Sequence, residues 1–185
     1  MPKNQFQRMI FALLTVIVTV HGYVFYSLYV VNGGTLMAVT GAPSVLEAIR
    51  QQGGVYMLGR SVPIWTVVLV EFCLAYLLET VMGSPMSFRL ACKVFDMKAT
   101  HHMLFETAVI CATVGLMCPV MSLLAAILYY PYYAGFNFLT LLANWIKLVC
   151  LNFPFAYFSQ LFFIQPLVRT VFKFLFCRNE TAQEA

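Results

Sequence analysis

The sequence has few charged residues. Only 10% of its 185 residues are Asp, Glu, Lys or Arg, whereas a soluble domain has about 25%. Hydrophobic residues make up 62% of the chain, and the mean hydropathy is +0.83. This balance excludes an ordinary soluble domain and indicates an integral membrane protein. The length suits one compact bundle, without a separate soluble domain.

The motifs of most catalytic and metal sites are also missing. The sequence has no glycine-rich phosphate loop, no HExxH and no Ser-His-Asp set in a plausible register, so we expect neither an enzyme nor a cofactor. Its six cysteines lack CxxC spacing, which argues against a zinc site or a disulfide framework. The first apolar run is long and lacks a small-x-small site, so we expect no cleavable signal peptide. The net charge of +4 comes from clusters beside apolar runs, and we expect no nucleic-acid partner.

Four apolar runs are long enough to cross a bilayer. They cover about residues 9–31, 63–83, 103–129 and 145–165, and a hydrocarbon core of about 30 Å requires about 20 helical residues. Lys and Arg gather before the first run, between the second and third, and after the fourth. Because these residues favour the cytoplasmic side, both termini are predicted to be cytoplasmic. Trp65 and Trp145 are then expected to open the second and fourth helices at the outer interface.

The first outer loop is predicted to contain a short surface helix. Ser44 and Glu47 have the spacing of a capping box, and Gly53 and Gly54 should end the helix that it starts. Three apolar side chains are expected to share its buried face: Val45, Leu46 and Ile49.

The chain contains an internal repeat. EFCLAYLLETVMGSP, which starts at Glu71, aligns without gaps with NFPFAYFSQLFFIQP, which starts at Asn152. The alignment also places Glu79 opposite Gln160, so both carboxyl groups of the first copy become amides in the second. The preceding helices match more weakly.

The repeat predicts the architecture. We expect an all-α integral membrane protein with four transmembrane helices and one short outer surface helix. The helices would form two parallel hairpin repeats related by an axis along the membrane normal. The single domain would comprise residues 1–185, with repeats at 1–99 and 100–178 and a frayed tail at 179–185.

Several segments resemble a known family. They are the doubled hairpin, PKNQFQR at 2–8, LMCPVMSL at 116–123 and NFPFAYFSQLFFIQPLVR at 152–169. Together they are similar to a widespread family of small bacterial membrane proteins built from two-helix repeats. The resemblance covers nearly the whole chain outside the first outer loop. It implies a four-helix fold in the bacterial cytoplasmic membrane and no particular activity. The proteobacterial antimicrobial compound efflux transporters resemble the chain more distantly. Their membrane glutamate lies in the first helix of the unit, so no residue is carried over from them.

Two glutamates are the main functional candidates. Glu71 and Glu79 would lie about 12 Å apart on one helix, as an outer and an inner station of a polar path. An ionised carboxylate in the apolar core costs at least about 2.5 kcal/mol, so such residues often have a function. A structural alternative pairs Glu71 with Lys147 and directs Glu79 toward Arg89 or lipid headgroups. The candidates for the substrate or proton pathway are Glu71, Glu79, Asn152, Gln160, Tyr76, Tyr157 and His21.

The remaining candidates each have two interpretations. The two amides would complement the carboxyl groups in coupling, or would form static bonds between helices. His21 would be a proton relay, or a hydrogen-bonded core residue. Pro119 is predicted to kink the third helix because it removes a backbone donor. Three sulfur-bearing residues are weak candidates for a copper site, although they also suit ordinary packing: Met117, Cys118 and Met121.

Our leading hypothesis is a small proton-coupled transporter of cationic or amphiphilic compounds. Glu71 would bind or exchange protons. One alternative is a non-transporting accessory or sensor module of the membrane; another is soft-metal handling. The expected partners are the lipid bilayer and a small-molecule ligand. If a pathway runs through the protein, a homodimer is also expected, because so small a bundle encloses little space.

Overall fold

The computed structural model describes residues 4–96 and 100–176, so the predicted tail at 179–185 lies outside it. Four helical stretches are long and apolar enough to cross a membrane: Gln5–Val31, Ile64–Val94, Met103–Leu128 and Phe138–Phe176. At most 22% of the most apolar window of each is buried within the chain. Most apolar side chains therefore face outward, as they would toward lipid. These features fit a multi-pass membrane protein.

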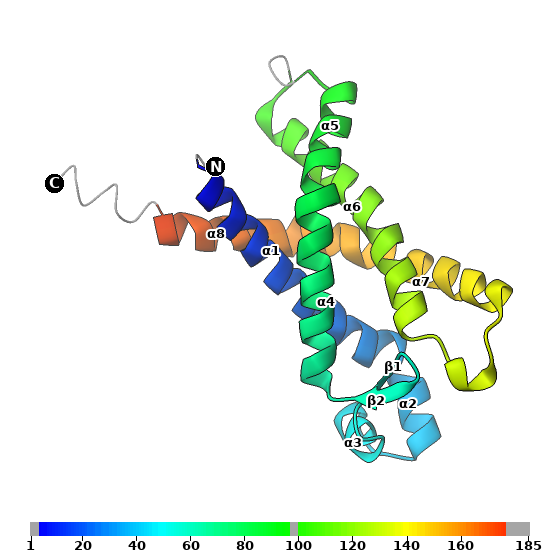
Figure 1. Ribbon diagram of the computed structural model, residues 1–185. Coiled ribbons are helices and arrows are strands. Elements are labelled where there is room, and N and C mark those ends of the chain that lie inside the picture. Colours follow the sequence, from blue (N-terminus) through cyan, green and yellow to red (C-terminus); the bar gives the residue numbers. More distant parts are fainter. Residues whose placement is uncertain (1–3, 97–99, 177–185) are drawn as a thin grey trace.

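Three of the four spans contain a π-helical segment. The first span joins α1 (Gln5–Phe25) to η1 (Tyr26–Val31), and the third is α6 (His102–Leu128) alone. In the second, η2 (Glu79–Gly83) connects α4 (Ile64–Leu78) to α5 (Ser84–Val94); in the fourth, η4 (Ser159–Ile164) connects α7 (Phe138–Phe158) to α8 (Gln165–Phe176). Figure 1 shows α4–α5 and α7–α8 as two long rods that run in different directions.

Small and β-branched residues pack the spans together. One buried cluster joins Val16, Val20 and Val24 of α1 to Ala75 of α4. A second joins α6 to α7, and its members are Val114, Cys118 and Ala156. Helix α5 also contacts α6, and α8 contacts α1. Small residues let helix backbones approach closely in a membrane, where the hydrophobic effect does not drive association.

The segment between the first two spans folds into short elements at one end of the molecule (Figure 1). They are α2 (Gly33–Thr40), α3 (Val45–Gln51), β1 (Val55–Met57) and β2 (Arg60–Val62). The two strands are antiparallel, with Val55 opposite Val62. Only α3 was predicted from the sequence.

The predicted cap of α3 is confirmed, and its buried face differs by one residue. The Ser44 Oγ accepts a hydrogen bond of 3.3 Å from the Glu47 N–H. The helix ends before two glycines with positive φ, at +71° and +134°. Val45 and Ile49 are buried as expected, whereas Leu46 is 51% exposed and Ala48 takes its place.

The fourth span starts earlier than the sequence predicted. The Asn137 Oδ1 caps α7 at Phe138 by accepting from the backbone N–H groups of Leu139 and Thr140. Trp145 therefore lies inside the helix, and its Nε1 donates to the Pro119 carbonyl oxygen at 2.9 Å. Trp65 does open α4, and its side chain is 77% exposed. Helix α6 continues as α-helix on both sides of Pro119.

Candidate functional site

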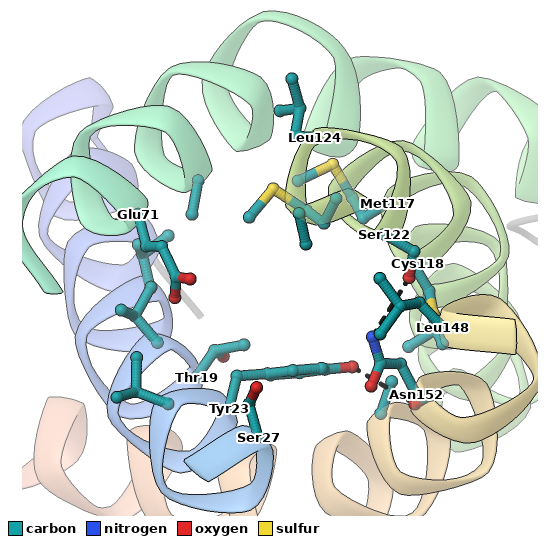
Figure 2. Close-up of a pocket in the computed structure, with 18 of the residues that line it drawn as sticks. Thr19, Tyr23, Ser27, Glu71, Met117, Cys118, Ser122, Leu124, Leu148 and Asn152 are labelled. Carbon is teal, nitrogen blue, oxygen red and sulfur yellow. Dashed lines mark hydrogen bonds between the residues drawn. The ribbon is translucent and has the colours of Figure 1, made fainter. Parts of the chain in front are cut away.

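A large cavity lies among the four spans. Its volume is about 1840 Å³, whereas ligand pockets usually have about 300–1,000 Å³. Residues from every span line it, from Tyr56 of β1 to Arg8 of α1 and Lys173 of α8. Figure 2 shows part of this cavity, with side chains from several helices directed into it.

Glu71 lines the cavity from α4. The Tyr129 hydroxyl, at the end of α6, donates a hydrogen bond to its Oε1. Burial and the nearby Glu71 carboxyl raise the pKa of the Tyr129 hydroxyl, so this group keeps its proton and acts as the donor. In Figure 2 the Glu71 carboxyl points into the cavity on the same side as Tyr23. The contact joins α4 to the end of α6 and leaves the carboxyl facing the cavity.

Glu79 lines the same cavity, where α4 gives way to η2. The Ser84 Oγ donates to Glu79 Oε1 at 2.8 Å. Within the described residues, neither Glu71 nor Glu79 forms an ion pair. The predicted pairing of Glu71 with Lys147 is therefore absent, and Arg89 does not line the cavity. Both carboxyl groups instead have hydroxyl partners.

The two amides line the cavity and also connect spans. The Asn152 Nδ2 donates to the Ser122 Oγ of α6 at 3.2 Å. The Gln160 Nε2 donates to the Thr19 Oγ1 of α1 at 3.0 Å. These are the bonds between helices that the static interpretation expects. The structure therefore brings together four of the seven pathway candidates: Glu71, Glu79, Asn152 and Gln160.

The other three candidates lie outside the cavity lining. Tyr76 stacks on Phe72 beside the cluster between α1 and α4. The Tyr157 hydroxyl contacts the Cys111 Sγ at 3.6 Å. His21 is exposed on α1, and its Nδ1 bonds to the carbonyl oxygen of Ile17 at 2.8 Å. Each of the three therefore has a contact outside the cavity lining.

The sulfur-bearing residues face the cavity without forming a recognisable metal centre. Met117, Cys118 and Met121 all line it, and Figure 2 shows Met117 and Cys118 at its wall. In residues 4–96 and 100–176, no three side chains of His, Cys, Asp or Glu are grouped as they would be around a metal ion. The sulfur atoms therefore contribute soft, adaptable surface to the cavity.

Three residues of the site were missed in the sequence. The Tyr23 ring extends across the cavity in Figure 2, and its hydroxyl reaches the Asn152 carbonyl oxygen at 3.5 Å. Tyr129 holds Glu71, as described above. Arg169 of α8 forms an ion pair of 2.5 Å with Glu106 of α6 at the other end of the cavity. The only sequence signal for this pair is opposite charge near the ends of two apolar runs.

The fold fits a multi-pass membrane protein, with a large cavity that carboxyl, amide, tyrosine and thioether groups line together. No family model, curated protein or solved structure matches this chain. Its own residues therefore carry the functional argument.

Proposed function

We propose that the protein is a small proton-coupled transporter of cationic, amphiphilic compounds, and that the cavity is its substrate path. One observation carries this proposal: Glu71 and Glu79 face the same large cavity and, among the described residues, neither forms an ion pair. Each carboxylate is costly in a membrane span, by at least about 2.5 kcal/mol when ionised. A cationic ligand in the cavity would offset that cost.

The groups near Glu71 suit an organic cation. The Tyr23 ring extends across the cavity that the Glu71 carboxyl faces (Figure 2), and an aromatic face attracts a cation through its quadrupole. Met117 and Met121 add flexible, polarisable surface, which adapts to apolar groups of different shapes. The Glu71 carboxylate would supply the opposite charge.

Proton exchange at Glu71 would couple the transport. The protonated carboxyl is neutral and tolerates the empty cavity, whereas the ionised carboxylate binds the cation. Binding of one cation then releases one proton to water, and protonation from the other side releases the cation. Tyr129 can donate its hydrogen bond to Glu71 in both states.

The repeat and the orientation are part of this proposal. Both η2 and η4 follow the longer helix of their span, and the second residue of the next helix is a proline, Pro85 in α5 and Pro166 in α8. Helix α1 packs on α4 as α6 packs on α7, and α5 contacts α6 as α8 contacts α1. Two hairpins related by a twofold axis would make these contacts. We place both termini on the cytoplasmic side of a bacterial cytoplasmic membrane.

The cavity changes the argument for a homodimer. That expectation depended on a four-helix bundle enclosing little space. A cavity of about 1840 Å³ within one chain accommodates a small organic cation without a second copy. The proposed path therefore does not require dimerisation.

A second candidate is a non-transporting membrane module. The bonds from Asn152 to Ser122 and from Gln160 to Thr19 favour it, because both connect helices. In that case the polar groups would stabilise the bundle and have no role in moving a substrate.

Uptake into vesicles distinguishes the two. Purified protein in lipid vesicles is given tetraphenylphosphonium, and uptake is driven by a pH gradient. Under the transport proposal Glu71→Gln abolishes uptake and leaves thermal unfolding nearly unchanged. The control is Glu47→Gln, whose carboxyl lies on α3 away from the cavity lining. Undiminished uptake by Glu71→Gln contradicts the assignment, and lost folding in the same variant supports the accessory module.

A further inference from the structure

The π-helical turn η2 brings Ser84 into contact with the Glu79 carboxyl. In such a turn the backbone N–H bonds to the carbonyl five residues earlier, and the Ser84 N–H donates to the Glu79 carbonyl oxygen in this way. The Ser84 Oγ also donates to the Glu79 Oε1 at 2.8 Å. Ser84 therefore contacts both the backbone and the carboxyl of Glu79.

Gly83 leaves the space that this carboxyl occupies. A Cβ atom at Gly83 would lie 2.6 Å from the Glu79 Oε2 and 3.0 Å from the Sδ of Met117 on α6. The φ angle of Gly83 is −55°, a value that any residue adopts. A side chain at this position would therefore displace the ends of the Glu79 and Met117 side chains, whereas the backbone conformation does not require glycine. The carboxyl sits in a recess between its own helix and α6.

The second π-helical turn shows that a carboxyl group is not needed to build such a turn. In η4 the Gln165 N–H donates to the Gln160 carbonyl oxygen, as Ser84 does to Glu79. The Gln165 Nε2 also reaches the Gln160 Oε1 at 3.5 Å. The same turn thus forms around an uncharged amide. Formation of the π-helical turn therefore does not explain why residue 79 carries a carboxyl group.

Among the described residues, the ionisable groups around η2 form no ion pair with this carboxyl. Helices α1, α4, α5 and α6 pack against η2. The residues that α5 brings to the cavity are not ionisable: Ser84, Ser87 and Phe88. The more distant helices α7 and α8 bring three basic residues: Lys147, Arg169 and Lys173. The ionisable groups that the other packed helices bring to the cavity are Arg8, Tyr23, Glu71, Glu106 and Cys118. Among the described residues, Ser84 is the side chain that bonds to the Glu79 carboxyl.

We propose that η2 is a proton-binding site facing the cavity, in which the Glu79 carboxyl takes up and releases the proton and Gly83 and Ser84 are positioning residues. The proton adds to a carboxylate oxygen from water in the cavity and returns to that water on release. The Ser84 hydroxyl donates to the ionised form. The inference depends on the proposed transport only for the use of this proton, because proton binding itself can be measured separately.

Infrared difference spectroscopy tests the site directly. The full chain in phosphatidylcholine vesicles is recorded as the pH is changed, and protonated carboxyl groups are followed by their C=O stretching band. Wild-type protein should show a band that titrates, that is lost in Glu79→Gln and that persists in Glu71→Gln. A Glu79→Gln spectrum identical to that of the wild type would overturn the proposal.

Two further variants test the positioning residues. Gly83→Ala should shift the Glu79 band, because the new methyl group displaces the carboxyl from Ser84. The matched control is Gly115→Ala on α6, where a Cβ has no neighbouring atom within 4 Å. In this variant the Glu79 band should be the same as in the wild type. Ser84→Ala adds no bulk and should also shift the band by removing the hydrogen bond. A Glu79 band that is the same in Ser84→Ala as in the wild type would overturn the positioning role.

Uptake of tetraphenylphosphonium separates this inference from the proposed function. A Glu79 band that titrates in a protein without uptake supports the site and contradicts the transporter. Uptake in a protein whose Glu79 band is absent supports the transporter and overturns the site. If both hold, Glu79→Gln should change the pH dependence of uptake, whereas Glu71→Gln abolishes uptake.

Discussion

The Tyr129 hydroxyl donates a hydrogen bond to the Glu71 carboxyl and thereby joins the end of α6 to α4. The Leu58 N–H, in the turn of the β-hairpin, donates to the Leu128 carbonyl oxygen at 2.8 Å. The end of α6 is therefore held by two contacts from the first half of the chain. One of them uses a carboxyl that also lines the cavity.

Tyr129→Phe should destabilise this junction. The substitution removes the donor and leaves a half-buried carboxyl without its partner, which costs about 1–3 kcal/mol. The free energy of unfolding in detergent should fall by that amount. Tyr132→Phe is the control, because the Tyr132 hydroxyl bonds locally to the Ile127 carbonyl oxygen. An equal decrease in the free energy of unfolding of the two variants would show that the bond to Glu71 stabilises the protein no more than the local bond of Tyr132.

The stabilisation by Tyr129 should decrease in the alkaline range. The pKa of its hydroxyl is raised in the folded protein, by burial first and by Glu71 second. A raised pKa means that the contribution is fully present below the pKa of an unfolded tyrosine, about 10, and decreases as the pH rises above it. The difference in unfolding free energy between wild type and Tyr129→Phe should thus decrease as the pH rises above about 10. A difference that stays constant above that pH would contradict the assignment.

The ion pair between Glu106 and Arg169 should couple α6 to α8. The Glu106 side chain is 12% exposed and that of Arg169 is 40% exposed, so solvent screens the pair only in part. We expect a coupling energy of about 1 kcal/mol in a double-mutant cycle of Glu106→Gln and Arg169→Gln. The measurement is the free energy of unfolding of the four proteins, repeated at high salt, where the coupling should shrink. Additive effects of the two substitutions would show that the pair contributes no coupling.

Leu58→Asn should stabilise the β-hairpin. Leu58 and Gly59 form its two-residue turn with φ values of +49° and +81°, and such turns favour Asn followed by Gly. Leucine at positive φ costs about 1 kcal/mol relative to a residue that tolerates it. Thermal unfolding should therefore occur at a higher temperature in Leu58→Asn and at a lower one in Leu58→Thr, since a β-branched residue is less tolerant still. The opposite order would contradict the turn geometry.

This turn also shows which features of the structure could not be predicted from the sequence. The spans were found because apolarity over about 20 residues is a local property, and the α3 cap because its residues are near neighbours. The hairpin was missed because leucine replaces the residue that usually marks its turn. The bond between Glu71 and Tyr129 was missed because it depends on how two helices are rotated toward each other. With ten tyrosines in the chain, no local signal distinguishes this one.

The two tryptophans give the last prediction, because the sequence placed both at an interface and the structure separates them. The Trp65 side chain is 77% exposed at the start of α4, whereas Trp145 lies inside α7 with its Nε1 bonded to Pro119. In vesicles, a water-soluble quencher should strongly reduce the fluorescence of Trp145→Phe, which retains Trp65. It should have little effect on Trp65→Phe, which retains Trp145.

The bond to Pro119 should also contribute to stability. Trp145→Phe keeps the aromatic packing and removes the donor, so the unfolding free energy should fall by about 1 kcal/mol. Trp65→Phe is the matched control and should leave it nearly unchanged, since its ring is mostly exposed. Equal quenching of the two single-tryptophan proteins would instead place Trp145 at the membrane surface. The fourth span would then begin at Trp145, as the apolar pattern alone predicts, and Asn137 would not be its cap.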